Sequence, residues 1–403
     1  MTKHQSKIEK LISQFCPNGV EFKELGKVTH YSKTRIAASE LNNESYVGVD
    51  NLLPNKQGKT LSNYVPKSGK LTRFEPDDIL LGNIRPYLKK VWYATHAGGT
   101  NGDVLVVRIN NDEGHKIYSA FLYYLLSSDD FFSFNMQHAK GAKMPRGSKN
   151  AILKYKIPLP PLDIQKEIAK ILNSFTELEA ELEAELEARK RQYKFYRDQL
   201  LDIKDVEYKT LGEIGSLIRG SGLQKKDFTE TGVECIHYGQ IYTYFGTFAD
   251  KTKTFVSREQ AKKLKKAQKG DVLIAGVSEN IEDVCKPLGW LGGEICISGD
   301  MFAFRHNQST KFITYLLQTT NFHKYKEKYA QGAKVTRVKG EKILAYKIPV
   351  PSLKEQERIA SILDKFEALV NDISIGLPAE LKARRSQYEY YRGKLLTFNQ
   401  YVS

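Results

Sequence analysis

Apolar residues recur every three or four positions along one long stretch of the chain, from Asp163 to about Leu201. This spacing predicts an amphipathic helix with a single apolar stripe. Pro158, Pro160 and Pro161 lie just before it and predict an extended entry, because proline fixes its own φ and disfavours helix in the residue before it. The stripe needs a partner surface, since a lone amphipathic helix would leave it in water.

The same segment returns near the end of the chain. Residues 157–175 align with residues 348–366 at a constant offset of 191, and more than half of the nineteen positions are identical. This indicates an internal duplication, and we expect the two long helices to pack on each other. The second copy is interrupted by Gly376 and Pro378, where we expect a kink or a short loop. In the first copy Glu-Leu-Glu-Ala occurs three times over residues 177–188, so the copy number sets the helix length.

A mixed segment precedes each long helix. Short tracts at Ser45–Val49, Asp78–Leu81 and Val104–Ile109 are typical of strands, and helical patterns follow at residues 118–126 and 312–318. A small amphipathic helix is predicted from Ile8 to Phe15. Blocks also match between the two segments: Val20-Glu21-Phe22-Lys23 with Val206-Glu207-Tyr208-Lys209, the tract from Asp78 with that from Asp271, and Gly102-Asp103 and Arg108 with Gly299-Asp300 and Arg305.

We therefore predict an α+β fold with two similar domains and two long helices. The first domain spans residues 1–155, and a central helical spacer spans residues 156–204. The second domain spans residues 205–346, and a C-terminal helical spacer spans residues 347–403.

Charge adds a partner class. The 62 basic and 47 acidic residues among 403 give a formal net charge of +15, which favours a polyanionic partner. Glutamates crowd residues 177–187, so the positive excess lies mostly in the two domains. No apolar run approaches the roughly 18 residues of a membrane span. With no secretory signal and four cysteines in no paired spacing, we expect a cytoplasmic protein that does not contact membranes.

Catalytic motifs are missing. The Asn/Asp-Pro-Pro-Tyr/Phe loop of adenine methylation is absent, and Pro160-Pro161 is followed by Leu162. The tract at residues 58–60 imitates the end of a phosphate-binding loop, but Leu53 stands where the first glycine belongs. The eight histidines show no metal-ligand spacing. We expect no catalytic residues, metal or cofactor of its own.

This organisation resembles the specificity subunit of type I restriction-modification systems. The resemblance rests on the two Ile-Pro-x-Pro-x-Leu-x-x-Gln segments, on Gly141-Ala142-Lys143 and Gly332-Ala333-Lys334 upstream of them, and on the Asp78 and Asp271 blocks. It implies two target-recognition domains, each reading one half of an asymmetric, interrupted double-stranded DNA sequence. The helices would form an antiparallel coiled coil that fixes the spacing and docks two modification subunits. Those subunits would use S-adenosylmethionine to methylate adenine, and a restriction subunit with ATP and magnesium would complete the endonuclease.

Candidate DNA contacts are of two kinds. Basic residues around the two pre-helix signals are candidates for phosphates: Lys143, Arg146 and Lys149, then Lys334, Arg337 and Lys339. Asn51 and Gln240 follow predicted matched strands, and their amides could bond adenine. Further candidates in the variable loops are Tyr31, Arg35, Arg85, Tyr87, Lys89, Lys90, Arg219, Lys225, Ser278 and Asn280. Exposed polar loop residues are common, so each could equally be solvated surface.

Two alternatives remain at this stage. A free-standing DNA-binding regulator would use both domains without partner subunits and bind its operators tightly. An enzyme that combines recognition with methylation in one chain is opposed by the missing motifs, and no aromatic ribonucleoprotein motif favours RNA.

Overall fold

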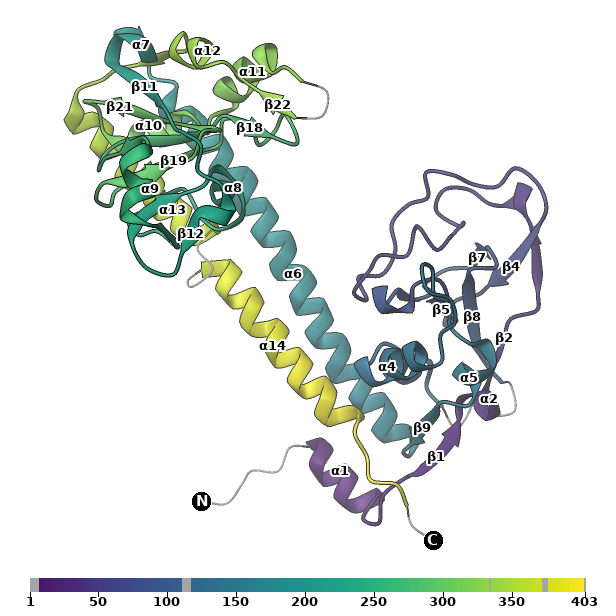
Figure 1. Cartoon of the computed structure of the whole chain (residues 1–403). Helices are drawn as coiled ribbons and strands as arrows, with labels where there is room; N and C mark the ends of the chain where they lie inside the picture. The colour runs from purple at the N-terminus through teal and green to yellow at the C-terminus, as the bar shows by residue number, and fades with distance from the viewer. Residues whose placement is uncertain (1–6, 111–116, 333–334, 372–375, 402–403) are drawn as a thin grey trace, which may run out of the picture. The chain divides into compact units, whose positions relative to one another are not determined.

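The computed structural model describes residues 7–110, 117–332, 335–371 and 376–401. The chain divides into two compact units, residues 1–180 with 383–403 and residues 181–382. Helix α6 (Leu162–Leu201) is continuous through the change from the first unit to the second (Figure 1). Each unit thus takes part of each helical spacer. The domain boundaries drawn from the sequence stay predictions.

Antiparallel sheets form the core of the first unit. Its strands are β1 (Glu21–Glu24), β2 (Thr29–Tyr31), β3 (Arg35–Ala37), β4 (Lys70–Phe74), β5 (Ile79–Gly82), β6 (Val91–Tyr93), β7 (Gly98–Thr100), β8 (Val104–Ile109) and β9 (Lys156–Leu159). Its helices are α1 (Lys7–Phe15), α2 (Leu25–Val28), α3 (Ser119–Leu126), α4 (Asp129–Gln137), α5 (Lys149–Leu153), the start of α6 and the end of α14 (Gly376–Leu396), with short 3₁₀ turns at Ala38–Glu40 and Pro86–Leu88. The sheets run β2-β8-β5-β6, β3-β4-β7 and β1-β9.

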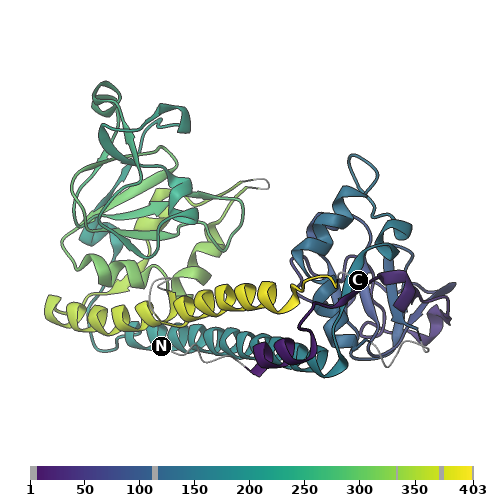
Figure 2. The ribbon, with the colours of Figure 1, turned by 90° about the horizontal axis from the view of Figure 1, so that it is seen from below.

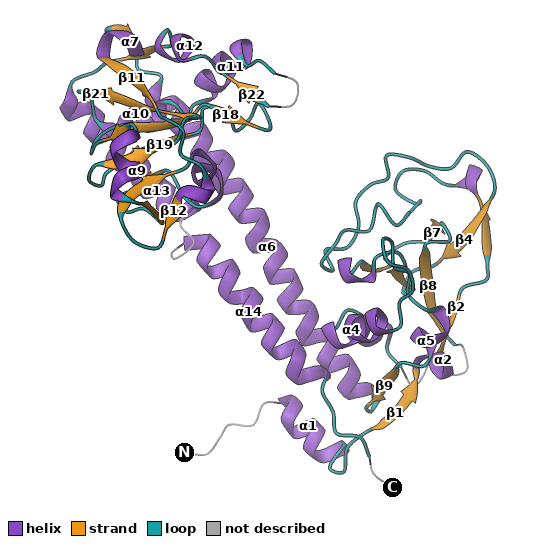
Figure 3. Cartoon of the chain, viewed as in Figure 1, coloured by secondary structure: helices purple, strands orange, loops and turns teal. Residues whose placement is uncertain are grey.

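The second unit has a similar plan with more strands, and it includes parallel as well as antiparallel strand pairs (Figure 3). Its strands are β10 (Tyr208–Thr210), β11 (Gly215–Arg219), β12 (Phe228–Thr229), β13 (Val233–Ile236), β14 (Phe248–Ala249), β15 (Thr254–Val256), β16 (Lys266–Ala267), β17 (Val272–Ala275), β18 (Val277–Ser278), β19 (Pro287–Trp290), β20 (Ile295–Ile297), β21 (Met301–His306), β22 (Thr336–Arg337) and β23 (Lys347–Pro349). Its helices are α7 (Leu211–Ile214), α8 (Tyr238–Thr243), α9 (Arg258–Lys263), α10 (Thr310–Leu316), α11 (Thr320–Tyr329), α12 (Gly340–Leu344), α13 (Leu353–Asn371) and the end of α6, with a 3₁₀ turn at Lys225–Asp227. The sheets run β11-β21-β17-β19-β14, β12-β15-β13-β20-β16, β10-β23 and β18-β22.

The matching sequence blocks form the same contacts in both units. The carboxylate of Asp78 accepts from Arg108 Nε at 2.8 Å and Nη2 at 2.5 Å. Asp271 accepts from Arg305 in the same way, at 3.1 and 2.9 Å. Both aspartates are buried, and a buried carboxylate needs such a bidentate partner. The pair therefore ties the central strand to its neighbour in each half.

The two repeated entry segments pair with the blocks that open the domains. β1 runs antiparallel to β9, with Phe22 opposite Pro158. β10 pairs with β23 in the same way, with Tyr208 opposite Pro349. The predicted extended entry is therefore the second strand of a two-stranded ribbon, where proline is tolerated because no further strand needs its missing N–H.

The long helices pair within each unit, as expected. In the first unit the ring of Phe175 on α6 stacks on Tyr391 of α14 at 5.6 Å between ring centroids, and Glu179 meets Arg385. Increasing numbers on α6 thus face decreasing numbers on α14, which makes this pair antiparallel, and Figures 1 and 2 show these two segments side by side. In the second unit Tyr196 of α6 stacks on Phe366 of α13 at 6.1 Å. The predicted antiparallel helical pairing is confirmed.

Other expectations from the pattern fare differently. The kink or loop expected near Gly376 falls mostly on residues 372–375, outside the described residues; α13 is described to Asn371 and α14 from Gly376, which has a left-handed φ of +72°. The strand predicted at Ser45–Val49 is wrong. Asn42 Oδ1 accepts from the N–H of residues 44 and 45, and such side-chain turns compete with strand pairing. An isolated bridge from Tyr46 to Gly99 is what remains of the pairing there.

None of the described helices carries an apolar run long enough to cross a bilayer.

Candidate nucleic-acid interface

A basic hairpin precedes the long helix in each unit. Lys140 and Arg146 exchange backbone hydrogen bonds of 2.9 and 2.8 Å, and Gln331 and Arg337 do the same at 2.9 Å each. Five residues of the sequence separate the paired residues in both units, and residues 333–334 of the second lie outside the described part of the chain. Gly141 and Gly332, which follow Lys140 and Gln331, have φ of +103° and +116°, a left-handed region that favours glycine. The sequence signals that precede the helices thus begin at a left-handed glycine in both units.

Each hairpin lies against the segment that follows the buried central strand. Arg146 bridges to Ile84 after β5, and Arg337 pairs with Val277 after β17. The Arg146 side chain is 59% exposed and meets Asp103 at 3.1 Å. A half-exposed guanidinium held by one carboxylate still has donors that can reach a phosphate.

In the second unit the hairpin borders a cavity of about 310 Å³. The structure brings three predicted contacts together there, Arg219, Arg337 and Lys339, with Asp300 beside them. Glycines 276, 299 and 340 line the same cavity without side chains, so an anionic group can approach the backbone closely.

In the first unit a hydrogen bond joins two of the predicted DNA contacts. Tyr31 OH donates to the carbonyl of Lys149 at 2.9 Å, which places these two candidates together, and burial raises the pKa of Tyr31. Lys143 is exposed in the hairpin. Arg35 lies on β3, where its guanidinium donates to Thr72 Oγ1 at 2.8 Å.

The loop after β5 divides its four candidates. Arg85 and Tyr87 are exposed, and the N–H of Arg85 donates to the carbonyl of Pro145 in the hairpin at 2.7 Å. Lys89 Nζ is bound to Asp129 at 2.7 Å, and Lys90 Nζ donates to the carbonyl of Val49. Burial lowers the pKa of Lys90. Of these four candidates, Arg85 and Tyr87 are thus the more exposed, and DNA contact by any of the four stays a prediction.

The two amides proposed for adenine are used inside the protein. Asn51 is 9% exposed; its Oδ1 accepts from the N–H of Gly48 and its Nδ2 donates to the carbonyl of Leu61. Gln240 lies in α8, not directly after a strand, and its Oε1 accepts from the N–H of His237. These contacts favour structural roles, and base contact by either residue stays a prediction.

The remaining candidates of the second unit are scattered. Lys225 is exposed in a 3₁₀ turn, and Ser278 is buried on β18. The amide of Asn280 is bonded within its own loop to Asp283. Lys334 lies outside the described residues. Asp103 and Asp129 pair with basic residues although no motif pointed to them as partners; the one available signal was the match of Asp103 with Asp300 between the repeats.

Comparisons with known proteins agree with this plan. The family model described as type I restriction modification DNA specificity domain matches residues 17–188 and again residues 203–383. The Escherichia coli type I restriction enzyme EcoR124I/EcoR124II specificity subunit is 33% identical over 305 residues, 72% of this chain and 73% of that protein. A putative type I restriction enzyme specificity subunit of Haemophilus influenzae is 32% identical over 329 residues, 77% of each chain.

Solved structures support the fold. A chain from a structure of the type I restriction-modification system matches with a TM-score of 0.63 at 18% identity, over 94% of this chain and 98% of its own. The S subunit of this system from M. genitalium matches with a TM-score of 0.50 at 15% identity, over 94% and 96%. At these identities the structural matches establish the fold, and the sequence matches establish the family. The chain belongs to the type I restriction-modification DNA specificity family and carries its characteristic domain twice.

Proposed function

We propose that this chain selects the DNA target of a type I restriction-modification complex, with each unit reading one half of a bipartite, asymmetric sequence. The observation that carries the proposal is the equivalent basic hairpin in two units whose other loops differ. Equivalent hairpins suit the phosphate contacts that every target requires, whereas different loops suit two different half-sequences.

The long helices would then have two tasks. Their length would set the number of base pairs between the half-sequences, and their outer faces would dock two modification subunits. S-adenosylmethionine and adenine methylation would belong to those subunits, and ATP and magnesium to a restriction subunit. The chain itself would contribute no catalytic residue.

The test is to map methylated adenines in cells that express the chain with its modification subunits. We expect methylation at one interrupted sequence with two unrelated halves, and none when the chain is omitted. Tight binding to a few operators by the chain alone, without methylation, would instead identify a free-standing regulator.

The hairpin arginines can be tested separately. Arg146→Ala and Arg337→Ala should each weaken DNA binding at every sequence and reduce the salt slope of log K by about one, because one phosphate contact is lost. Fluorescence anisotropy of the assembled complex at several salt concentrations measures both. Lys10→Ala, an exposed lysine on α1, is the matched control. A changed sequence preference with an unchanged salt slope would contradict the phosphate role.

A further inference from the structure

One helix of each unit reaches the loop that follows the central strand. We call residues 83–90 and residues 276–286 the reading loops, because they follow β5 and β17 and contain predicted DNA contacts. Helix α4 contacts the first reading loop through Asp129, and α11 contacts the second through Lys326. The two anchors have opposite charge but equivalent tasks.

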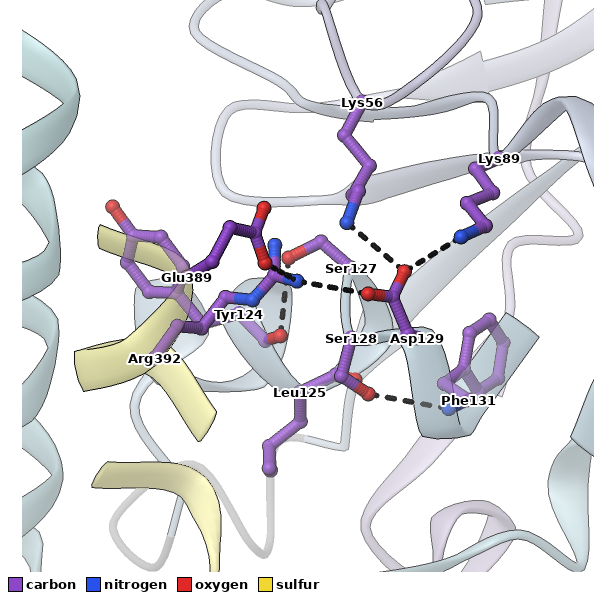
Figure 4. Close-up of polar contacts among 10 residues, drawn as sticks. All are labelled: Lys56, Lys89, Tyr124, Leu125, Ser127, Ser128, Asp129, Phe131, Glu389 and Arg392. Carbon is purple, nitrogen blue, oxygen red and sulfur yellow. Dashed lines mark hydrogen bonds and ion pairs between the residues drawn. The ribbon is translucent and has the colours of Figure 1, made fainter. Parts of the chain in front are cut away.

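Three cations surround the carboxylate of Asp129. Its Oδ1 accepts from Lys89 Nζ at 2.7 Å and from Lys56 Nζ at 3.1 Å, and Arg392 Nη2 lies 3.3 Å from Oδ2 (Figure 4). Burial alone would raise its pKa, but the hydrogen bonds from Lys89 and Lys56 outweigh burial and lower the pKa to about 2. The anchor is therefore ionised at neutral pH.

The two lysines belong to turns with unfavourable backbone conformations. Lys56 has φ of +66°, and Arg85 and Lys89 in the reading loop have φ of +52° and +51°. The N–H of Lys56 donates to the carbonyl of Lys89 at 2.9 Å, so the two turns are joined. Left-handed residues other than glycine persist where surrounding contacts hold them. Asp129 supplies such a contact to both turns at once.

Apolar packing is incomplete beside this anchor. A cavity of about 370 Å³ borders Asp129 and Arg392, with Leu125 and Leu396 among its other walls. Arg392 is 5% exposed and also forms an ion pair with Glu389, so its guanidinium is paired with two carboxylates inside the protein. Ionic contacts thus join α4 to the reading loop and to α14, beside the apolar core that holds Phe131, Phe132 and Leu395.

The second unit anchors its reading loop by a buried ammonium. Lys326 is 5% exposed, and its Nζ donates to the carbonyls of Glu282 and Val284, at 2.6 Å each. Cys285, between these contacts and β19, has φ of +61°. At the position equivalent to Asp129 stands Thr320, whose N–H donates to Asp198 of α6. The reading loop is thus held here by a different residue of the same helix.

We propose that Asp129 and Lys326 are positioning residues for sequence selection, each acting on the half-sequence that its own unit reads. The proposal rests on the proposed function. Loss of an anchor would release the left-handed turns of that loop, and the exposed side chains between them would no longer be held in one arrangement. Discrimination would then fall at one half-sequence and persist at the other.

The test uses full-length Asp129→Asn and Lys326→Met in the complex with both modification subunits. Libraries with each half-sequence randomised are methylated, and the methylated fraction is sequenced. We expect each variant to reduce discrimination about tenfold in one half while the other half stays within twofold, and the two variants to affect different halves. Asp129→Glu, which keeps the charge, should restore part of the discrimination.

Asp198→Asn is the matched control. It removes the carboxylate on α6 that accepts from the N–H of Thr320 at the start of α11, and it changes no residue of a reading loop. Discrimination at both halves should stay as in the wild type. An equal loss at all sites, or two variants that affect the same half, would overturn the inference and leave the anchors merely structural. Lys326→Met can unfold its unit because the ammonium is buried. If it does, the result for Asp129→Asn alone decides the test, since the Asp129 side chain is 53% exposed. If the wild-type complex methylates no bipartite sequence, the proposed function itself fails.

Discussion

A buried glutamine closes the start of the long helix in each unit. Gln165 is fully buried, accepts from the N–H of Tyr118 at 2.8 Å and donates to the carbonyl of Pro160 at 2.7 Å. Gln356 makes the equivalent contacts with Ser309 and Pro351. The buried side chain thus satisfies one backbone N–H and one backbone carbonyl in each unit, which explains the repeated Leu-x-x-Gln in physical terms.

Replacing this glutamine by leucine should destabilise the unit that contains it. Gln165→Leu leaves a buried N–H and a buried carbonyl without that partner, at a cost of about 3 kcal/mol. Denaturant unfolding of the full chain measures the loss. Lys166→Met changes the neighbouring exposed side chain and should stay within about 0.5 kcal/mol. Equal stability of the two variants would show that the glutamine contacts contribute little.

His306 gives the second unit a pH dependence. Its ring lies on Phe304, its Nδ1 accepts from the N–H of Gln308, and burial lowers its pKa to about 4. The unfolded chain therefore binds the extra proton first, and stability falls as the pH drops from about 6.5 towards 4. Between pH 7.5 and 4.5 the wild type should lose roughly 2 kcal/mol more than His306→Asn, measured by urea unfolding. Parallel stability curves would refute the assignment.

Elements with a strong period were predictable from the sequence. The stripe at residues 163–201 became α6, as its spacing of three and four residues predicted, and the Asp78 and Val104 tracts became β5 and β8, whose side chains are mostly buried. The tract at Ser45–Val49 failed because side chains of Asn42 and Asn51 bond its backbone, which no alternation of apolar residues reveals.

The position of the two hairpins could be predicted from the sequence, because the Gly-Ala-Lys signals precede the long helix in both repeats. Their contact with phosphates stays a proposal. At Asn51 and Lys90 the residue type does not reveal that the polar groups are bonded within the protein, and DNA contact by either residue stays a prediction. Asp129 and Lys326 could not be predicted, because their partners lie far away in the sequence. Asp129 contacts Lys89, and Lys326 contacts the carbonyl of Glu282.

The acidic tract of α6 allows a test of the helix as a spacer. Deleting Glu181–Ala184 removes about 6 Å of helix and about 1.1 turns, so the faces on either side stay nearly aligned. The contacts of Phe175 and Tyr196 lie outside the deletion. Methylation mapping should then show the same two half-sequences with a gap shorter by one or two base pairs of about 3.4 Å. An unchanged gap would contradict the spacer role.

At the scale of the whole molecule, the order of the chain differs from the order of its units. The last residues join the first unit: Leu395 is buried in its core, and the N–H of Val20 donates to the carbonyl of Asn399 at 2.9 Å. The end of α6 has the equivalent place in the second unit, where Leu201 is buried. Each unit is therefore completed by a helix end from the other repeat.

Ending the chain at Lys382, where the second unit ends, tests this arrangement. The first unit would lose Tyr391, Arg392 and Leu395, and each large apolar side chain removed costs roughly 1.5–3 kcal/mol of burial. Hydrogen exchange should therefore accelerate in residues 118–137 and 157–175, although the deletion begins about 200 residues later in the sequence. Residues 272–304, in the second unit, should keep their protection and serve as the internal control. Tyr390→Ala changes a residue of α14 that is 57% exposed, and it should leave both regions protected. Unchanged hydrogen exchange in the truncated chain would show that the first unit is complete without its last helix.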